Sequence, residues 1–230
     1  MSFQVAIDGP AGAGKSTVAK IVAAEKNFIY VDTGAMYRAM ALYFLRNGID
    51  GKDEAAVSNA CRMLEVTISY QDGVQQVILN GENVSGQIRT EEVGSMASAT
   101  SGYPAVREKL LMLQRRLARE ADVLMDGRDI GTCVLPDADV KIYLTADSLE
   151  RAKRRYKELK EKGVECDLSE IERDIIERDQ RDMTRELSPL KQAEDAILLD
   201  SSHMTLREVV DEIGRIIDTA LSPADAGGRP

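Results

Sequence analysis

Short apolar runs and helically spaced apolar residues alternate along this chain. Runs typical of buried strands occupy 4–8, 28–31, 123–125, 140–144 and 196–199. Apolar residues recur at helical spacing over 16–23, 35–46, 53–63, 91–97, 106–119, 151–162, 169–186 and 206–221. Strands that alternate with helices predict an α/β fold, a doubly wound parallel sheet of about five strands with helices on both faces.

The pattern changes to strict alternation after residue 65. Val66, Ile68 and Tyr70 alternate with polar residues, and a further apolar run at 74–79 follows a turn at Gly73. Both features favour a small antiparallel sheet inserted into the chain. The expected organisation is one domain, 1–230, with a core at 1–60 and 97–221, an insertion at about 61–96, a helical lid at about 151–168 and a disordered tail at 222–230.

The charge balance limits the possible ligands. The 230 residues include 30 Lys and Arg against 39 Asp and Glu, a formal net charge of −9. Such a chain is a poor non-specific binder of nucleic acid or of an anionic membrane, so an anionic ligand needs a local basic cluster. Residues 151–162 supply one, with seven basic and two acidic side chains. This helix suits a lid that closes over phosphates, and the alternative is a solvated charged face.

Cysteine and histidine are sparse. Cys61, Cys133 and Cys166 form no CxxC pair, which favours free thiols in the cytoplasm. A single histidine, His203, excludes a His-rich zinc site and argues against a Ser-His-Asp hydrolase. The longest apolar run, 39–45, is far shorter than the roughly 18 residues of a membrane-spanning helix. We expect a cytoplasmic monomer without a nucleic-acid or membrane partner.

The segment from Gly9 to Ser16 matches the pattern GxxxxGK[ST] between a predicted strand and a predicted helix. Glycines let backbone N–H groups point inward, and the helix N-terminus adds positive potential, so the loop forms a nest for phosphate. Lys15 would bridge the β- and γ-phosphates of ATP, and Ser16 would bind Mg²⁺. The alternative is a glycine-rich turn that binds nothing. The predicted ATP-binding residues are Gly9, Pro10, Ala11, Gly12, Ala13, Gly14, Lys15, Ser16 and Thr17.

Two polar residues follow predicted strands. Asp126 stands where P-loop proteins keep a carboxylate for Mg²⁺, although an aspartate there is also a common helix cap. Thr33 is placed to cap the helix at 35–46.

Cationic residues share one stripe of the helix at 169–186. Arg178, Arg181 or Asp182, and Arg185 have the spacing of one helix face. The stripe is either a solvated ion-pair surface or the cationic wall that phosphoryl transfer requires.

The chain lacks the NKxD segment of a GTPase. It resembles the bacterial cytidylate kinases over about residues 3–221. The resemblance is carried by IDGPAGAGKST (7–17), DTGAMYR (32–38), SGQIRTEEV (85–93), YPAVRE (103–108), DGRDIGT (126–132), PDADVKIYL (136–144) and ERDQRDMTR (177–185).

The resemblance implies an acceptor site for CMP or dCMP, phosphorylated by ATP with Mg²⁺ to give CDP or dCDP. It implies that Thr33, Arg38, Arg128 and Arg185 hold the acceptor phosphate, that Arg178 and Asp182 lie at the ribose, and that Ser98, Arg107 and Asp129 read the cytosine edge. We expect the catalytic residues to be Lys15, Arg128, Arg154 and Arg185. The alternatives are a P-loop kinase of another small acceptor, such as UMP or shikimate, and a slow nucleotide-binding switch.

Overall fold

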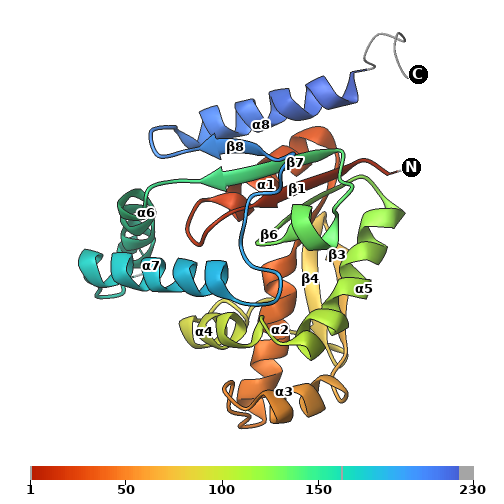
Figure 1. Cartoon of the computed structure of the whole chain (residues 1–230), viewed down its shortest axis with the longest axis vertical. Helices are drawn as coiled ribbons and strands as arrows, with labels where there is room; N and C mark the ends of the chain where they lie inside the picture. Colours follow the sequence, from red (N-terminus) through yellow and green to blue (C-terminus); the bar gives the residue numbers. More distant parts are fainter. Residues whose placement is uncertain (1, 162, 223–230) are drawn as a thin grey trace.

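A five-stranded parallel sheet forms the centre of the structure, a computed structural model that describes residues 2–161 and 163–222 (Figure 1). The strands, in spatial order, are β2 (Ile29–Asp32), β6 (Val123–Gly127), β1 (Gln4–Asp8), β7 (Val140–Thr145) and β8 (Ile197–Asp200). All neighbouring pairs are parallel. The predicted doubly wound sheet is confirmed. Of the expected tail, residues 223–230 lie outside the described residues, as does Lys162 of the basic segment.

The helices cover both faces of this sheet. Their bounds are α1 (Lys15–Lys26), α2 (Thr33–Arg46), α3 (Glu54–Cys61), α4 (Glu91–Thr100), α5 (Pro104–Glu120), α6 (Ser148–Glu161), α7 (Leu168–Thr184) and α8 (Leu206–Leu221). A π-helical turn, Ile130–Val134, follows β6 and was not predicted.

Alternate residues of the central strand enter different cores. Val5 and Ile7 join one buried cluster with residues of α1 and α8, whereas Ala6 joins the other with residues of α2 and α5. Successive side chains of a strand point to opposite faces, so a sheet covered on both sides must be apolar at every position. Figure 1 shows α8 on one side of the sheet and α2 and α5 on the other.

The centre of the sheet brings several loops together. At its carboxyl end β1 lies between β6 and β7, with Asp8 paired to Gly127 and to Tyr143. The chain leaves these three strands at the same edge, where ligands bind in open α/β sheets. The glycine-rich loop after β1 therefore lies beside the loop after β6.

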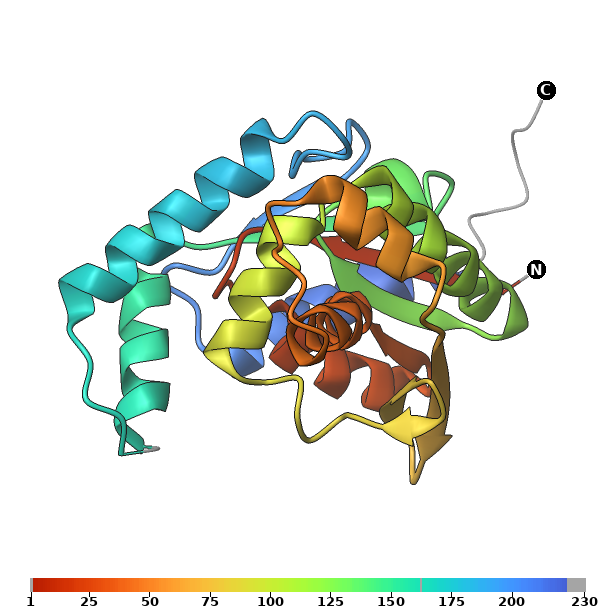
Figure 2. The same ribbon diagram turned by 90° about the horizontal axis from the view of Figure 1, so that it is seen from below.

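The predicted antiparallel insertion is present as β3 (Val66–Gln71), β4 (Val74–Leu79) and the short β5 (Glu82–Asn83). Its two turns, at 72–73 and 80–81, have positive φ at both residues, the geometry of tight hairpins. Val77 and Leu79 of this sheet, and Val84 directly after it, belong to the same buried cluster as residues of α2 and α5. The insertion therefore shares the core of the domain. Figure 2 shows its strands in gold beside the rest of the domain.

The helix at 35–46 begins earlier than predicted. Asp32 is the N-cap of α2, because its Oδ1 accepts a hydrogen bond from the Ala35 N–H at 2.9 Å. Thr33 is already helical, and its hydroxyl donates to the Asp126 backbone carbonyl at 2.7 Å. The prediction that Thr33 caps this helix is wrong, because the carboxylate one residue earlier takes that position.

Val77 and Val74 allow a matched test of the shared core. They lie on the same strand, but Val77 is 2% exposed and Val74 58%. We expect Val77→Ala to lower the free energy of unfolding by about 1–3 kcal/mol, and Val74→Ala to change it by less than about 0.5 kcal/mol. Urea unfolding followed by circular dichroism measures the free energy of unfolding of both variants. An equal loss in the two variants would contradict the prediction that Val77 stabilises the shared core.

Candidate active site

The loop between β1 and α1 begins at a position that only glycine can occupy. Gly9 has φ +149°, and a Cβ there would lie 1.9 Å from the Leu144 carbonyl oxygen of β7. Gly12 and Gly14 have φ of +75° and +85°, which glycine adopts without strain. The loop leads directly into the N-terminus of α1, whose free N–H groups attract anions. It therefore has the backbone geometry that a phosphate-binding loop requires.

The Lys15 ammonium is buried against this loop. Its side chain donates to the carbonyl oxygens of Gly9 at 2.8 Å and Pro10 at 2.7 Å. Burial lowers the pKa of Lys15 well below its usual value, and Arg128 lowers it further, whereas Asp126 raises it. The loop carbonyls hold this cation where a phosphate chain bound to the loop would meet it.

Ser16 and Asp126, the two predicted Mg²⁺ ligands, are in direct contact. The Ser16 hydroxyl donates to Asp126 Oδ2 at 2.9 Å, and the Tyr30 hydroxyl donates to Oδ1 at 2.8 Å. Burial and the nearby charge of Asp32 raise the pKa of Asp126 to about 6. A carboxylate and a hydroxyl are the oxygen ligands that Mg²⁺ uses at nucleotide sites, with phosphate and water completing the shell. These donors fit Mg²⁺, and the described residues contain no cluster of three or more His, Cys, Asp and Glu for another metal.

Four cationic side chains from four different elements converge beside this loop. Lys15 comes from α1, Arg38 from α2, Arg128 from the loop after β6 and Arg178 from α7. Burial lowers the pKa of Arg178 to about 10 and also lowers the pKa of Arg38, and in both cases the charge of Arg128 lowers it further. Arg178 Nε is buried and forms no hydrogen bond within the described structure. Such mutual repulsion is relieved when a polyanion binds between the cations.

Carboxylates pair with two arginines of this region. Asp182 Oδ2 accepts from Arg128 Nε at 3.0 Å, which joins α7 to the loop after β6. Asp32 pairs with Arg89, from the segment that follows the insertion, at 2.5 Å. Burial alone would raise the pKa of Asp32, but Arg89 and Arg38 lower it below the ordinary value. The sequence analysis missed Arg89, whose only signal was its place in the segment SGQIRTEEV.

The three residues expected at the base edge lie on α4, on α5 and beside β6. Asp129 accepts a short hydrogen bond from Arg107 and lies 3.5 Å from Arg185 Nη2. Ser98 Oγ is buried and has no partner within the described residues. Arg185 also donates to the Ser188 carbonyl at 2.7 Å and to Ser101 Oγ at 3.3 Å. The Asp129 carboxylate, the Arg107 guanidinium and the free Ser98 hydroxyl can together recognise a ring that carries both donors and acceptors.

The stripe predicted on the helix at 169–186 separates into two surfaces. Asp182 is buried, Arg178 and Arg185 are partly buried, and Arg181 is exposed. Because α7 ends at Thr184, Arg185 lies just beyond the helix as its C-cap. Of the two residues considered for the middle of the stripe, Asp182 is the one that is buried and contacts Arg128 of the cation cluster.

The basic helix α6 has two different faces. Arg151 donates to the Ala11 carbonyl at 2.8 Å and pairs with Asp179 of α7 at 2.6 Å, and Asp179 in turn accepts from the Ala11 N–H at 3.2 Å. Arg154 donates to the Ser201 carbonyl at 2.7 Å. A Cβ added to Gly14 would lie 3.9 Å from Arg154 Nη1. These arginines therefore lie against the glycine loop.

The outer face of α6 forms ion pairs of its own. Lys153 pairs with Glu150 at 2.7 Å, and Arg155 pairs with Glu158 at 3.1 Å. Acidic neighbours one helical turn away partly neutralise these residues, so this side of the helix fits the alternative of a solvated charged face. In Figure 2, α6 and α7 form an arm at one side of the sheet.

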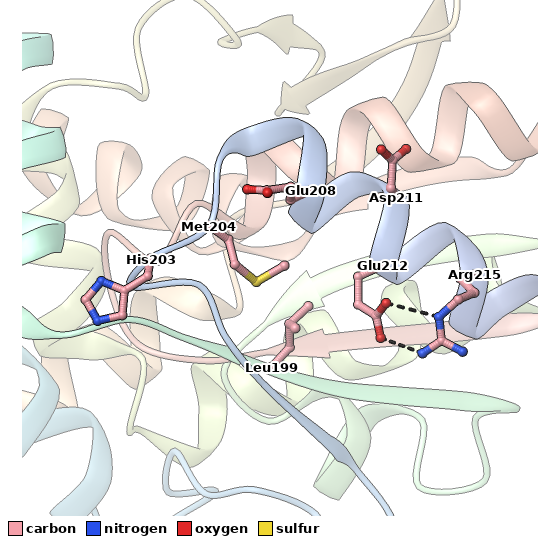
Figure 3. Close-up of a pocket in the computed structure, with 7 residues that line it drawn as sticks. All are labelled: Leu199, His203, Met204, Glu208, Asp211, Glu212 and Arg215. Carbon is pink, nitrogen blue, oxygen red and sulfur yellow. Dashed lines mark hydrogen bonds and ion pairs between the residues drawn. The ribbon is translucent and has the colours of Figure 1, made fainter.

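An open hollow of about 530 Å³ lies elsewhere, between the edge strand β8 and α8 (Figure 3). Its lining residues are Leu199, His203, Met204, Glu208, Asp211, Glu212 and Arg215. Glu212 and Arg215 form an ion pair at 2.6 Å across part of it. None of the predicted site residues lines this hollow.

The glycine loop, the cation cluster and the parallel sheet together define a P-loop kinase. The family model "Cytidylate kinase" matches residues 5–219, and the chain belongs to the cytidylate kinase family. It is 52% identical to the cytidylate kinase of Lactobacillus johnsonii over 94% of each chain. It is also 48% identical to that of Caldicellulosiruptor bescii over 92% of this chain and 93% of the relative. No helix among residues 2–161 and 163–222 is long and apolar enough to cross a membrane.

Replacing Lys15 tests the phosphate loop. We expect Lys15→Ala to fold normally, because it removes a buried charge, and to lose about 10²-fold or more in kcat with ATP and CMP. Lys20→Ala is the matched control, since Lys20 is exposed on the same helix. Steady-state rates and thermal unfolding are measured for both variants. Unchanged turnover in Lys15→Ala would contradict the prediction.

Proposed function

We propose that this protein transfers the γ-phosphoryl group of ATP to CMP or dCMP, forming ADP and CDP or dCDP. The observation that carries the proposal is the convergence of Lys15, Arg38, Arg128 and Arg178 at the carboxyl edge of the sheet. A phosphoryl transferase stabilises and aligns phosphate oxygens and needs little else from the protein. Membership of the cytidylate kinase family supports cytidine nucleotides as the acceptor.

On the donor side, residues 9–17 bind the phosphates of ATP through backbone N–H groups. Lys15 stabilises the charge that develops on the transferring group, and Arg154 approaches the loop from α6. Ser16 and Asp126 hold Mg²⁺, which neutralises charge on the β- and γ-phosphates when bound. Because burial raises the pKa of Asp126, a bound cation would also favour its ionised form.

On the acceptor side, Arg38, Arg128 and Arg185 bind the phosphate of CMP, with the Thr33 hydroxyl nearby. An oxygen of that phosphate attacks the γ-phosphorus in line, and the bond to the β–γ bridging oxygen breaks as ADP leaves. The attacking oxygen is already anionic at neutral pH, so the reaction needs no strong general base. This agrees with a chain that contains one histidine, exposed at the edge of the hollow beside β8.

The nucleoside of the acceptor binds beside α4, α5 and α7. Arg178 and Asp182 lie at the ribose, and Ser98, Arg107 and Asp129 meet the cytosine edge. Cytosine offers an N4 amino donor with N3 and O2 acceptors, which a carboxylate, a guanidinium and a hydroxyl complement. The unpaired Ser98 hydroxyl supports this assignment, because a buried polar group without a partner is costly unless a ligand satisfies it.

The insertion orders the acceptor side of the site. Gln75 of β4 donates to the Asp32 carbonyl at 3.1 Å and accepts from the Asp32 N–H at 2.8 Å. The Arg89 pair with Asp32 joins the segment after this sheet to the same residue. Free thiols at Cys61, Cys133 and Cys166 support a reducing compartment such as the cytoplasm.

Incubation with ATP, Mg²⁺ and single acceptors tests the function. The acceptors are CMP, dCMP, UMP, AMP and shikimate, with a reaction lacking acceptor as control, and chromatography separates the products. We expect ADP and CDP, or ADP and dCDP, in equal amounts, with the highest kcat/KM for a cytidine nucleotide. A higher kcat/KM with shikimate or UMP would identify a different kinase, and equal ADP release without acceptor would identify a slow nucleotide switch.

Asp129 provides a test of base selection. A carboxylate that accepts from the cytosine amino group would meet the O4 acceptor of uracil, which is repulsive in a dry pocket. Asp129→Asn keeps the shape and supplies a donor, so we expect it to lose CMP activity and to narrow the CMP-to-UMP ratio of kcat/KM about 10-fold or more. Competition between the two nucleotides measures this ratio. An equal fall in the kcat/KM for CMP and for UMP would contradict this role and would indicate that Asp129 only orders Arg107 and Arg185.

A further inference from the structure

Asp8, the last residue of β1, links the two halves of the site, although the proposed function gives it no role in binding either nucleotide. It precedes Gly9, the first residue of the phosphate loop, and is 5% exposed. Its Oδ1 accepts from the Ile130 N–H at 2.8 Å, and its Oδ2 accepts from the Gly131 N–H at 2.7 Å. Both donors belong to the π-helical turn after β6. One side chain therefore binds the backbone of a segment more than a hundred residues away.

The segment that Asp8 holds follows directly after Arg128 and Asp129, which the proposed function places at the acceptor phosphate and base. On the other side of these two residues, Gly127 is fixed in the sheet as the register partner of Asp8. Asp8 therefore anchors the chain on both sides of Arg128 and Asp129. Its backbone is paired with Gly127 in the sheet, and its carboxylate binds the turn that begins at Ile130. The first N–H groups of a helical turn have no partner within the turn, so an outside acceptor determines where the turn lies.

Gly131 packs closely against the side chains of Lys141 and Asp8. A Cβ at Gly131 would lie 3.2 Å from Lys141 Cδ and 3.4 Å from Asp8 Oδ2. The absence of a side chain at this position therefore lets the backbone of the turn approach the carboxylate without crowding Lys141.

The buried carboxylate of Asp8 also carries a cost in folding stability. Burial raises its pKa to about 6, although the two backbone donors lower it. At neutral pH the folded chain therefore holds a buried carboxylate whose ionisation opposes stability. The two hydrogen bonds to the turn are therefore made at a cost in stability.

We propose that Asp8 is a positioning residue, which holds the loop bearing Arg128 and Asp129 at a fixed place relative to the phosphate-binding loop. The inference rests on the proposed function. In-line transfer requires donor and acceptor phosphates to be aligned, and a displacement of about 1 Å costs up to roughly 10²-fold in rate. Asp8 is joined to the donor loop through the chain and to the acceptor loop through two hydrogen bonds, so it determines their separation.

The test compares Asp8→Asn with Asp139→Asn. Asp139 also accepts a backbone N–H of β1, that of Gln4 at 2.8 Å, but at the opposite end of the strand, far from the site. The amide of Asp8→Asn can accept only one of the two hydrogen bonds and presents its own N–H₂ to the other donor. We expect Asp8→Asn to lower kcat/KM for CMP about 10- to 100-fold, with binding of a fluorescent ATP analogue unchanged. Asp139→Asn should match the wild type in both measurements.

A second variant approaches the same contact from the turn. Gly131→Ala leaves the charge of Asp8 in place but pushes the backbone away from it, and it should also raise the KM for CMP while ATP binding is retained. Equal losses in ATP and CMP binding, or parity of both variants with the wild type, would overturn the positioning role. Failure of the proposed function is distinguishable, because the wild type itself would then not phosphorylate CMP.

Discussion

The concentration of positive charge at one edge of the sheet is the constraint on which the rest of this structure depends. Lys15, Arg38, Arg128 and Arg178 repel one another, and carboxylates interleaved among them offset part of this repulsion. Asp182 is one of these carboxylates: it restrains an arginine by a single pair and leaves other N–H groups of that guanidinium available to phosphate. The folded protein thus keeps the cations in place without neutralising the site, which is what a phosphoryl-transfer centre requires.

Three aspartates at the carboxyl ends of adjacent strands show how environment separates identical residues. Asp8 accepts from two backbone N–H groups, Asp32 caps α2 and pairs with Arg89, and Asp126 accepts from two hydroxyls. Burial raises the pKa of Asp8 and Asp126, whereas at Asp32 the arginines outweigh burial and lower it. Asp32, which has charged donors, is therefore the most acidic of the three. Asp126, beside Ser16, has a more basic carboxylate than Asp32, which suits a cation ligand.

The arm formed by α6 and α7 is tied to the phosphate loop at its base. Arg151 and Asp179 contact the carbonyl and the N–H of Ala11, so both helices share one anchoring point. Asp179 lies on α7 together with Arg178 and Asp182, the residues proposed to meet the acceptor. A rearrangement of the glycine loop at Ala11 would therefore also move these two residues, because they share one helix with Asp179.

The sequence by itself determined the alternation of strands and helices, the glycine loop at 9–17, the antiparallel insertion and the family resemblance. Each of these is a property of contiguous residues, since strand and helix periods and the φ demands of glycine act locally. It also brought forward Ser16 and Asp126, which the structure places in contact. What only the tertiary structure decided was the pairing: that Arg89 meets Asp32, and that Asp8 holds the turn at 130–134. The partners in these two contacts lie 57 and 122 residues apart in the chain. A single sequence contains no local signal that tells which distant arginine or N–H group a buried carboxylate will bind. The close packing of the folded core determines that partner.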